Sequence, residues 1–176
     1  MKDIGLVVML SDNLERHRFV EPCEFVEILG AKAAILSTWR YMLRRTACVL
    51  VSLEAPGMRR EQVSELLNAI RSDTATALRR NRLWKPMDTF VVLGCNSGLY
   101  DQLTPLVPSL VGKGRLHANR IVDILLFDRE NPRVVHGNGN SHALGPCLAQ
   151  VPDLVTQWVQ HQRGDNRSAS GASVLR

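Results

Sequence analysis

Runs of apolar residues predict the strands of this chain. Four runs are almost continuous in Val, Ile and Leu, without alternating polar residues, and they cover residues 5–10, 47–53, 89–94 and 120–127. A strand that is covered on both faces has this pattern, as in the centre of a parallel sheet. A shorter run at residues 133–136 follows a turn-like segment, and we expect it to pair antiparallel with the strand before it.

Segments with a helical spacing of apolar residues separate these strands. Residues 31–46, 59–80 and 141–162 each carry apolar residues at intervals of three and four, which line one face of a helix. Residues 97–111 have the same spacing, but their two prolines predict a short or broken helix. Residues 14–29 show no clear pattern.

The order of these elements predicts an α/β fold, because alternating strands and helices are typical of parallel βαβ units. We expect a single three-layer domain over residues 1–162, with a mostly parallel sheet, a Rossmann-like βαβαβ core and a C-terminal β-hairpin and helix. The strand at residues 5–10 adds to the same sheet. Residues 163–176 are rich in Ser, Gly and Arg, and we expect a disordered tail there.

Composition excludes some classes of protein. No run of about 18 apolar residues is present, so we expect no transmembrane helix, and the first apolar run is too short for a signal peptide. The chain has neither a Walker A lysine nor a GxGxxG motif, and we expect no cofactor. Its four cysteines are scattered without metal-ligand spacing; they are Cys23, Cys48, Cys95 and Cys147. We therefore expect reduced thiols, no metal site and a cytoplasmic protein.

Charge is distributed unevenly along the chain. The net charge is +5, yet residues 31–85 hold 11 Lys and Arg against 4 Asp and Glu. Two basic clusters lie in this flank, each in or just after the last turn of an expected helix, where cations complement the helix dipole. They also fit phosphate contact, with a tryptophan available to stack on a base, or a protein interface. The candidate residues are Arg40, Arg44, Arg45, Arg79, Arg80, Arg82, Trp84 and Lys85.

Two loops stand where ligands bind in parallel α/β sheets, beyond the carboxyl ends of strands. In the first, at residues 94–98, Gly94, Asn96 and Ser97 fit an anion-binding turn at a helix start. Cys95 fits a nucleophile whose thiolate the helix dipole stabilises. Alternatively, Asn96 or Ser97 caps the helix and the glycine serves tight packing.

The second loop covers residues 137–142. Asn138 and Asn140 fit an anion-binding loop, and they fit a plain tight turn equally well. His136 and His142 flank the loop, and either is a candidate general base for Cys95.

The stretch from Asp123 to Asn138 resembles the metal-binding hairpin of restriction-endonuclease-like nucleases. That hairpin carries an Asp on one strand and Glu-x-Lys on the next, so Asp123 or Asp128 matches the first acid. The second strand offers His136-Gly137-Asn138 in place of Glu-x-Lys. The resemblance covers under a fifth of the chain and implies at most a degenerate, non-cutting relative.

Because charge is concentrated and no complete catalytic constellation is present, we expect a non-catalytic binding subunit. It contacts nucleic acid or a protein partner, and no membrane, through the basic flank of residues 31–85. The first alternative is a small-molecule or nucleotide-binding domain, or a Cys-dependent hydrolase, with its site at residues 94–98 and 137–142. The degenerate nuclease-like domain is the second alternative.

Overall fold

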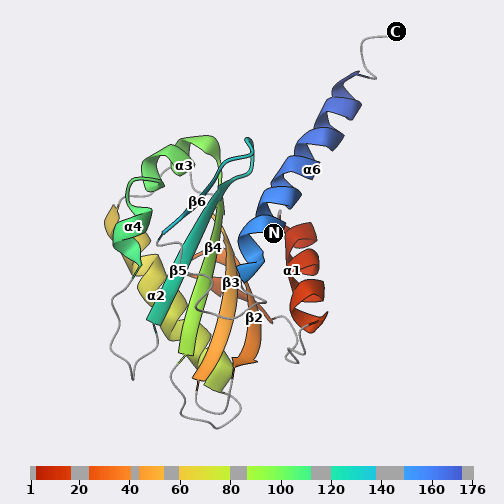
Figure 1. The fold of residues 1–176 in the computed structure, drawn as a ribbon. Helices are drawn as coiled ribbons and strands as arrows, with labels where there is room; N and C mark the ends of the chain where they lie inside the picture. Colours follow the sequence, from red (N-terminus) through yellow and green to blue (C-terminus); the bar gives the residue numbers. More distant parts are fainter. Residues whose placement is uncertain are drawn as a thin grey trace.

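The computed structural model describes residues 3–16, 24–40, 44–53, 60–79, 87–111, 120–137 and 149–171. They form an α/β fold with a six-stranded mixed sheet (Figure 1). The helices are α1 (Ile4–Arg16), α2 (Arg60–Arg79), α3 (Ser97–Leu103), α4 (Val107–Leu110) and α6 (Val151–Gly171). The strands are β1 (Glu24–Ile28), β2 (Ala31–Arg40), β3 (Arg44–Ser52), β4 (Met87–Cys95), β5 (Arg120–Asp128) and β6 (Val134–His136).

The strands follow one another across the sheet in chain order. β1, β2 and β3 are antiparallel neighbours, β3, β4 and β5 are parallel, and β6 returns antiparallel to β5. The predicted parallel core at residues 47–53, 89–94 and 120–127 and the hairpin that follows it are therefore confirmed. The helix expected at residues 59–80 and the broken helix at 97–111 are also confirmed, as α2 and as α3 with α4.

The prediction of a first strand at residues 5–10 is wrong, because these residues lie within α1. Their side chains are buried with helical spacing, and the spacing continues beyond the run; the buried residues are Leu6, Val7, Leu10 and Leu14. A short apolar run carries the pattern of a buried strand and of a buried helix at once. Leu14 distinguishes the two, because it continues the helical spacing of buried residues beyond the apolar run.

The helix predicted at residues 31–46 is also wrong, because β2 and the start of β3 occupy this segment. Four consecutive side chains of β2 are buried, and they alternate between two core clusters: Ala33 and Ile35 belong to one, Ala34 and Leu36 to the other. The pairing of β2 with β1 and β3 thus overrides a spacing that is compatible with a helix.

A tight turn joins β1 to β2 within the segment that showed no pattern. Ile28 pairs with Ala31, and the two residues between them, Leu29 and Gly30, have φ angles of 48° and 78°. Two successive positive φ angles fit a type I′ hairpin turn. Leucine is an unusual residue at such a position, and Leu29 is also exposed.

Two hydrophobic clusters lie on opposite faces of the sheet, since successive residues of a strand point to opposite sides. On β4, Val91 and Leu93 belong to one cluster, which contains residues of α2, α3 and α4. Phe90 and Val92 belong to the other, which contains residues of α1 and α6. Helices thus cover both faces of the parallel core.

Helix α6 continues to Gly171, past residue 163 where the composition predicts a disordered tail. Figure 1 shows the last turns of α6 extending away from the sheet. No helix within the described ranges is long and apolar enough to cross a membrane.

The sheet has two ends that differ in chemistry. We call the end where β3, β4 and β5 finish, at Ser52, Cys95 and Asp128, the carboxyl end; it lies near α3 in Figure 1. We call the end where these strands begin the amino end. There Arg45 pairs with Met87, and Asp88 pairs with Arg120.

Candidate functional site

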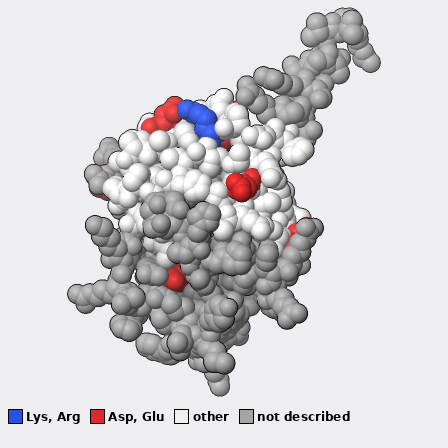
Figure 2. Space-filling view, viewed as in Figure 1, with Lys and Arg blue, Asp and Glu red and all other residues white. Residues whose placement is uncertain are grey.

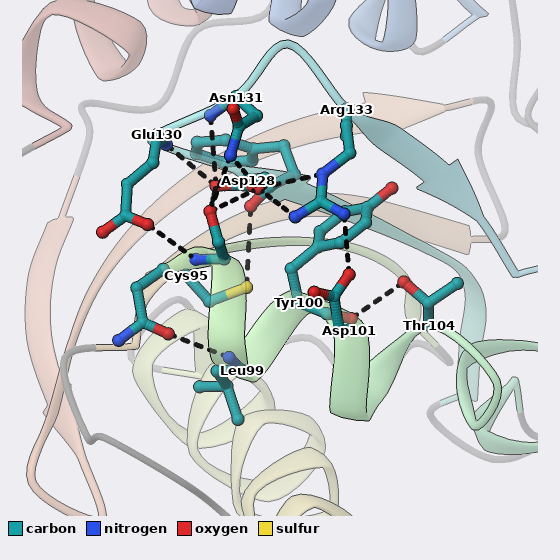
Figure 3. Close-up of polar contacts among 12 residues, drawn as sticks. Cys95, Leu99, Tyr100, Asp101, Thr104, Asp128, Glu130, Asn131 and Arg133 are labelled. Atoms are coloured by element: carbon teal, nitrogen blue, oxygen red, sulfur yellow. Dashed lines mark hydrogen bonds and ion pairs between the residues drawn. The ribbon is translucent and has the colours of Figure 1, made fainter.

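Asp128 is the centre of a polar network at the carboxyl end (Figure 3). The side chain is fully buried, and its carboxylate accepts hydrogen bonds from Arg133 Nη2 at 2.6 Å and Nε at 3.0 Å. Ser97 Oγ donates at 2.9 Å, and the backbone N–H of Glu130 donates at 2.8 Å. Burial by itself would raise the pKa of Asp128, but these hydrogen bonds outweigh it and lower the pKa. Asp128 is therefore an ionised structural acceptor and a weak base.

Arg133 is held from three sides in this network. Besides Asp128, its Nη1 contacts the carboxylate of Asp101 at 2.7 Å. Its guanidinium carbon lies 4.6 Å from the centre of the Tyr100 ring, a cation–π contact. The charge of Arg133 is thus compensated by neighbours within the chain.

Arg129 anchors α1 to the same end of the sheet. Its Nη2 lies 2.7 Å from Asp3 Oδ2 and its Nε lies 2.9 Å from Asp3 Oδ1, which makes a two-pronged ion pair. Asp3 is 1% exposed and Arg129 is 15% exposed. The guanidinium also donates to the carbonyl of Leu53 at 3.0 Å and to the hydroxyl of Ser52. One cation therefore joins the start of α1 to the ends of β3 and β5.

Residues 94–98 have internal roles. A Cβ on Gly94 would lie 2.4 Å from Phe127 Cζ, so only glycine fits there without displacement. Asn96 is the N-cap of α3, and its Oδ1 accepts from Leu99 N at 2.9 Å. Ser97 is hydrogen-bonded to Asp128. The structure therefore matches the alternative in which Asn96 caps the helix and Gly94 serves tight packing. It gives no support to an anion site.

Cys95 does not have the properties of a nucleophile. The side chain is fully buried, and its Sγ lies 3.7 Å from the carbonyl oxygen of Phe127. Burial, the largest cause, raises the pKa of Cys95 to about 12. Since the thiolate is the reactive form, this thiol stays protonated and inert at neutral pH.

The second predicted loop lies largely outside the described residues. Asn138, Asn140 and His142 belong to this part of the chain, so their approach to Cys95 stays a prediction. Gly137 is described, and a Cβ on it would lie 2.4 Å from Val111 Cγ2. Close packing explains this glycine.

The two acids of the nuclease-like hairpin do not meet. Asp123 and Asp128 both lie on β5, five positions apart, which is about 16 Å at the rise of a strand. Two carboxylates that ligate one ion must lie within about 5 Å of each other, given metal–oxygen distances near 2.1–2.6 Å. β6 supplies no acid, and no group of His, Cys, Asp and Glu that could hold a metal is found within the described ranges. The geometry does not support a metal centre here.

At the amino end, strand register places three of the predicted basic positions. Arg40 and Arg44 are directly opposite each other on β2 and β3, and Arg45 is opposite Met87 on β4. α2 ends at Arg79, and the chain from there leads into Met87. Arg80, Arg82, Trp84 and Lys85 belong to this connection and lie outside the described residues. The first cluster thus lies at the strand ends, and where the undescribed residues of the second cluster lie stays a prediction.

No protein-family model, no curated protein and no solved structure matches this chain. A functional conclusion therefore has to come from the two ends of the sheet themselves.

Two parts of these ends were missed in the sequence. The first is the pair of arginines, Arg129 and Arg133, that fix the carboxyl end. The signal was present, because Asp128 opens a turn-like segment and two arginines follow it, one and five positions later. An Asp in such a place accepts backbone and side-chain hydrogen bonds. The second is Arg120, which begins β5 one strand away from Met87 and Asp88.

Figure 2 shows how the charges of the described residues are placed on one face of the molecule. The described residues of this face are mostly uncharged, and their Lys and Arg atoms gather at the upper end beside acidic atoms. The mixed charge there agrees with the paired arginines of the carboxyl end.

Proposed function

We propose that this chain is a binding domain whose amino end contacts nucleic acid. The observation that supports it most is the strand register, which brings basic positions from β2, β3 and β5, and from the end of α2, to one end of the sheet. The positions concerned are Arg40, Arg44, Arg45, Arg79 and Arg120. We also propose that the fold is a three-layer, Rossmann-like arrangement.

The sequence around these positions strengthens the charge argument. Three segments lead into the starts of β3, β4 and β5, at residues 40–45, 79–85 and 113–120, and together they contain 10 of the 22 Lys and Arg. None of the three segments contains Asp or Glu. A polyanion such as nucleic acid, with a charge at every phosphate, is the partner for a surface of this kind.

The opposed arginines of β2 and β3 also indicate a function. Like charges directly opposite each other on neighbouring strands destabilise a sheet, and Arg40 faces Arg44 in the register. The dipole of a helix end does not account for them, because they lie on strands. Positions that break a local rule of stability are expected where a binding function needs them.

The carboxyl end gives catalysis little support. Asp128 and Arg133 are bonded to each other, the pKa of Asp128 is lowered, and the pKa of Cys95 is raised. A general base or nucleophile for neutral pH needs the opposite shifts.

Fluorescence anisotropy with a labelled oligonucleotide tests the proposal. We expect binding at 50 mM salt that weakens steeply at 200 mM salt, because phosphate contacts release counterions. Arg44→Gln should lower the slope of log affinity against log salt by about 0.7–0.9. Lys32→Gln is the matched control: it removes one exposed charge from β2 opposite Ser52, at the carboxyl end. The proposal fails if no oligonucleotide binds at 50 mM salt, or if the two variants lose affinity equally.

A further inference from the structure

We infer that two copies of this chain associate through β1, the outer edge of which pairs with the same strand of the second copy. β1 is the first strand of the sheet, and no strand of the described residues pairs with its outer side. The inference goes beyond the proposed function, because it concerns a different surface. It holds whether or not the chain binds nucleic acid.

The turn between β1 and β2 determines which backbone groups of β1 point outward. In a two-residue hairpin the residues on either side of the turn form a hydrogen-bonded pair, and such pairs alternate with non-bonded pairs along the strands. Ile28 and Ala31 are therefore bonded to each other, and Val26, two positions earlier, is also bonded to β2. The N–H and C=O groups of Phe25 and Glu27 point away from β2. Among the described residues, none bonds to them.

The exposed large apolar side chains of the described residues belong to α1 and to the hairpin of β1. Phe25 and Leu29 are each 61% exposed, and Ile4 and Val8 of α1 are 54% and 53% exposed. Phe25 is opposite Ala34, which belongs to the cluster that contains residues of α1. Its ring is thus on the face of the sheet that α1 covers. An exposed apolar side chain on an open sheet edge favours pairing with a strand of another chain.

The other edge of the sheet lacks this combination. It is formed by β6, which has three residues, all of them half-buried. β6 therefore offers fewer backbone groups than β1, and it has no exposed large apolar side chain. Of the two edges, β1 is the one that fits a partner strand.

Charge favours a second copy of this chain as the partner. Two identical strands pair antiparallel about a two-fold axis, and residues directly opposite each other then share a face of the sheet. With the axis at Val26, Phe25 of each copy is opposite Glu27 of the other, and each of these pairs exchanges both of its N–H···O bonds. An axis at Glu27 would bring two carboxylates together, which destabilises a sheet. An axis at Phe25 would leave Glu27 without a partner in β1. The strand is self-complementary in the first register.

Glu27 is compatible with this pairing. Charged residues on edge strands often prevent association, and Glu27 is exposed. Lys32 is directly opposite it on β2 and is exposed as well, so an opposite charge already lies beside this carboxylate in the same sheet. In the dimer Glu27 keeps Lys32 on one side and gains the uncharged Phe25 of the second copy on the other.

The antiparallel pairing determines the arrangement of the dimer. The two six-stranded sheets become one continuous sheet, and α1 of both copies lies on the same face of it. Because the copies run in opposite directions, their amino ends lie at opposite ends of the joined sheet.

Sedimentation velocity of the full chain at about 1–100 µM, the range of a modest interface, tests the inference. We expect the wild type to shift from the mass of one chain, 19.7 kDa, toward twice that mass as the concentration rises. Glu27→Pro removes an outward N–H and leaves the bonds to β2 in place, so this variant should stay a monomer at every concentration. A wild type that is a monomer throughout would overturn the inference and leave the edge to a partner of another sequence.

His136→Pro is the matched control, because it places a proline on the other edge strand. Gly137 N donates to Ile124 O at 2.8 Å, so the N–H of His136, one position earlier, points away from β5. This variant should dimerise like the wild type. Equal loss of the dimer in both variants would contradict the assignment to β1.

Amide hydrogen exchange of the wild-type protein makes the test independent of both variants. The amides of Phe25 and Glu27 should exchange at least about threefold more slowly at the highest concentration than at the lowest, because the dimer then contains most of the chains. The outward amide of His136 should not change. If exchange at Phe25 and Glu27 does not depend on concentration, the inference is wrong, even where Glu27→Pro fails to fold.

Discussion

The two ends of one sheet treat their arginines differently. At the carboxyl end, Arg129 contacts the buried carboxylate of Asp3, and Arg133 contacts the buried carboxylate of Asp128. At the amino end, Arg40, Arg44 and Arg45 stand in a row of strand ends, and the segments around them contain no acid. The first arrangement uses charge to join elements of the fold, and for the second we propose a partner outside the chain.

If the proposal holds, the location of a cation in the fold decides its role. Arg129 and Arg44 are the same residue type, yet the first has Asp3 within 2.7 Å and the second has Arg40 opposite it. Substitution should therefore affect folding at one end and binding at the other. The predictions below test this contrast, in order of expected size.

The largest effect is expected for Arg129→Met. It leaves Asp3, 1% exposed, without its cation, and breaking one side of a buried ion pair costs about 3–5 kcal/mol. Urea denaturation followed by circular dichroism measures the loss in the free energy of unfolding. A loss below about 1 kcal/mol would show that α1 does not depend on this ion pair.

A pair of glycine substitutions tests the loop after β4. Gly94→Ala would place a Cβ 2.4 Å from Phe127 Cζ, and overpacking of this kind costs about 1–3 kcal/mol. The control is Gly98→Ala, whose Cβ meets only Asn96 Oδ1 at 3.8 Å. Melting temperatures should fall for the first variant and stay the same or rise for the second. Equal stability of both variants would contradict the tight packing of Gly94.

Asp128→Asn should destabilise the fold by about 2 kcal/mol at pH 7, because hydrogen bonds to a charged acceptor contribute about 1.5–3 kcal/mol. The pKa of Asp128 is lowered in the folded protein from its ordinary value of 3.8. Its ionised form therefore stabilises the fold fully above that value, and the contribution is lost as pH falls through the lower, folded pKa. The difference between wild type and variant should be constant from pH 7 to 5 and shrink below pH 4. A difference that does not depend on pH would argue against an ionised Asp128.

The smallest effect on folding is expected for Arg44→Gln. Removing one of two opposed cations should change the free energy of unfolding by no more than about 0.5 kcal/mol, and the change should be stabilising. The same urea titration measures it. A loss like that of Arg129→Met would mean that Arg44 is a structural residue, and the contrast between the two ends would disappear.

The sequence predicts the parallel core of the sheet well and its N-terminal third poorly. β3, β4 and β5 are recognisable because both faces are buried, which requires continuous apolar runs. Residues 5–10 were misassigned because a buried helix and a buried strand share the pattern of a short apolar run, and residues 31–46 were misassigned because the spacing of their apolar residues also fits a helix. Only the packing of α1 and the pairing of β2 decide between the two.

The candidate site was predicted in part. Both basic clusters were visible in the sequence, but the pairing of Arg45 with Met87 was not, because it joins residues far apart in the chain. The internal role of residues 94–98 was one of three open alternatives, beside an anion-binding turn and a cysteine nucleophile, and the bond from Ser97 to Asp128 favours it. Such long-range contacts leave no local trace in the sequence.

Cross-linking tests the central claim most directly. Ultraviolet cross-linking of the protein to a single-stranded oligonucleotide, followed by mass spectrometry, identifies the peptides that touch the ligand. We expect cross-links in peptides that contain residues 39–45, 79–85 or 113–120, the segments that lead into the starts of β3, β4 and β5. Cross-links confined to residues 95–101 and 128–133, at the carboxyl end, would contradict the account.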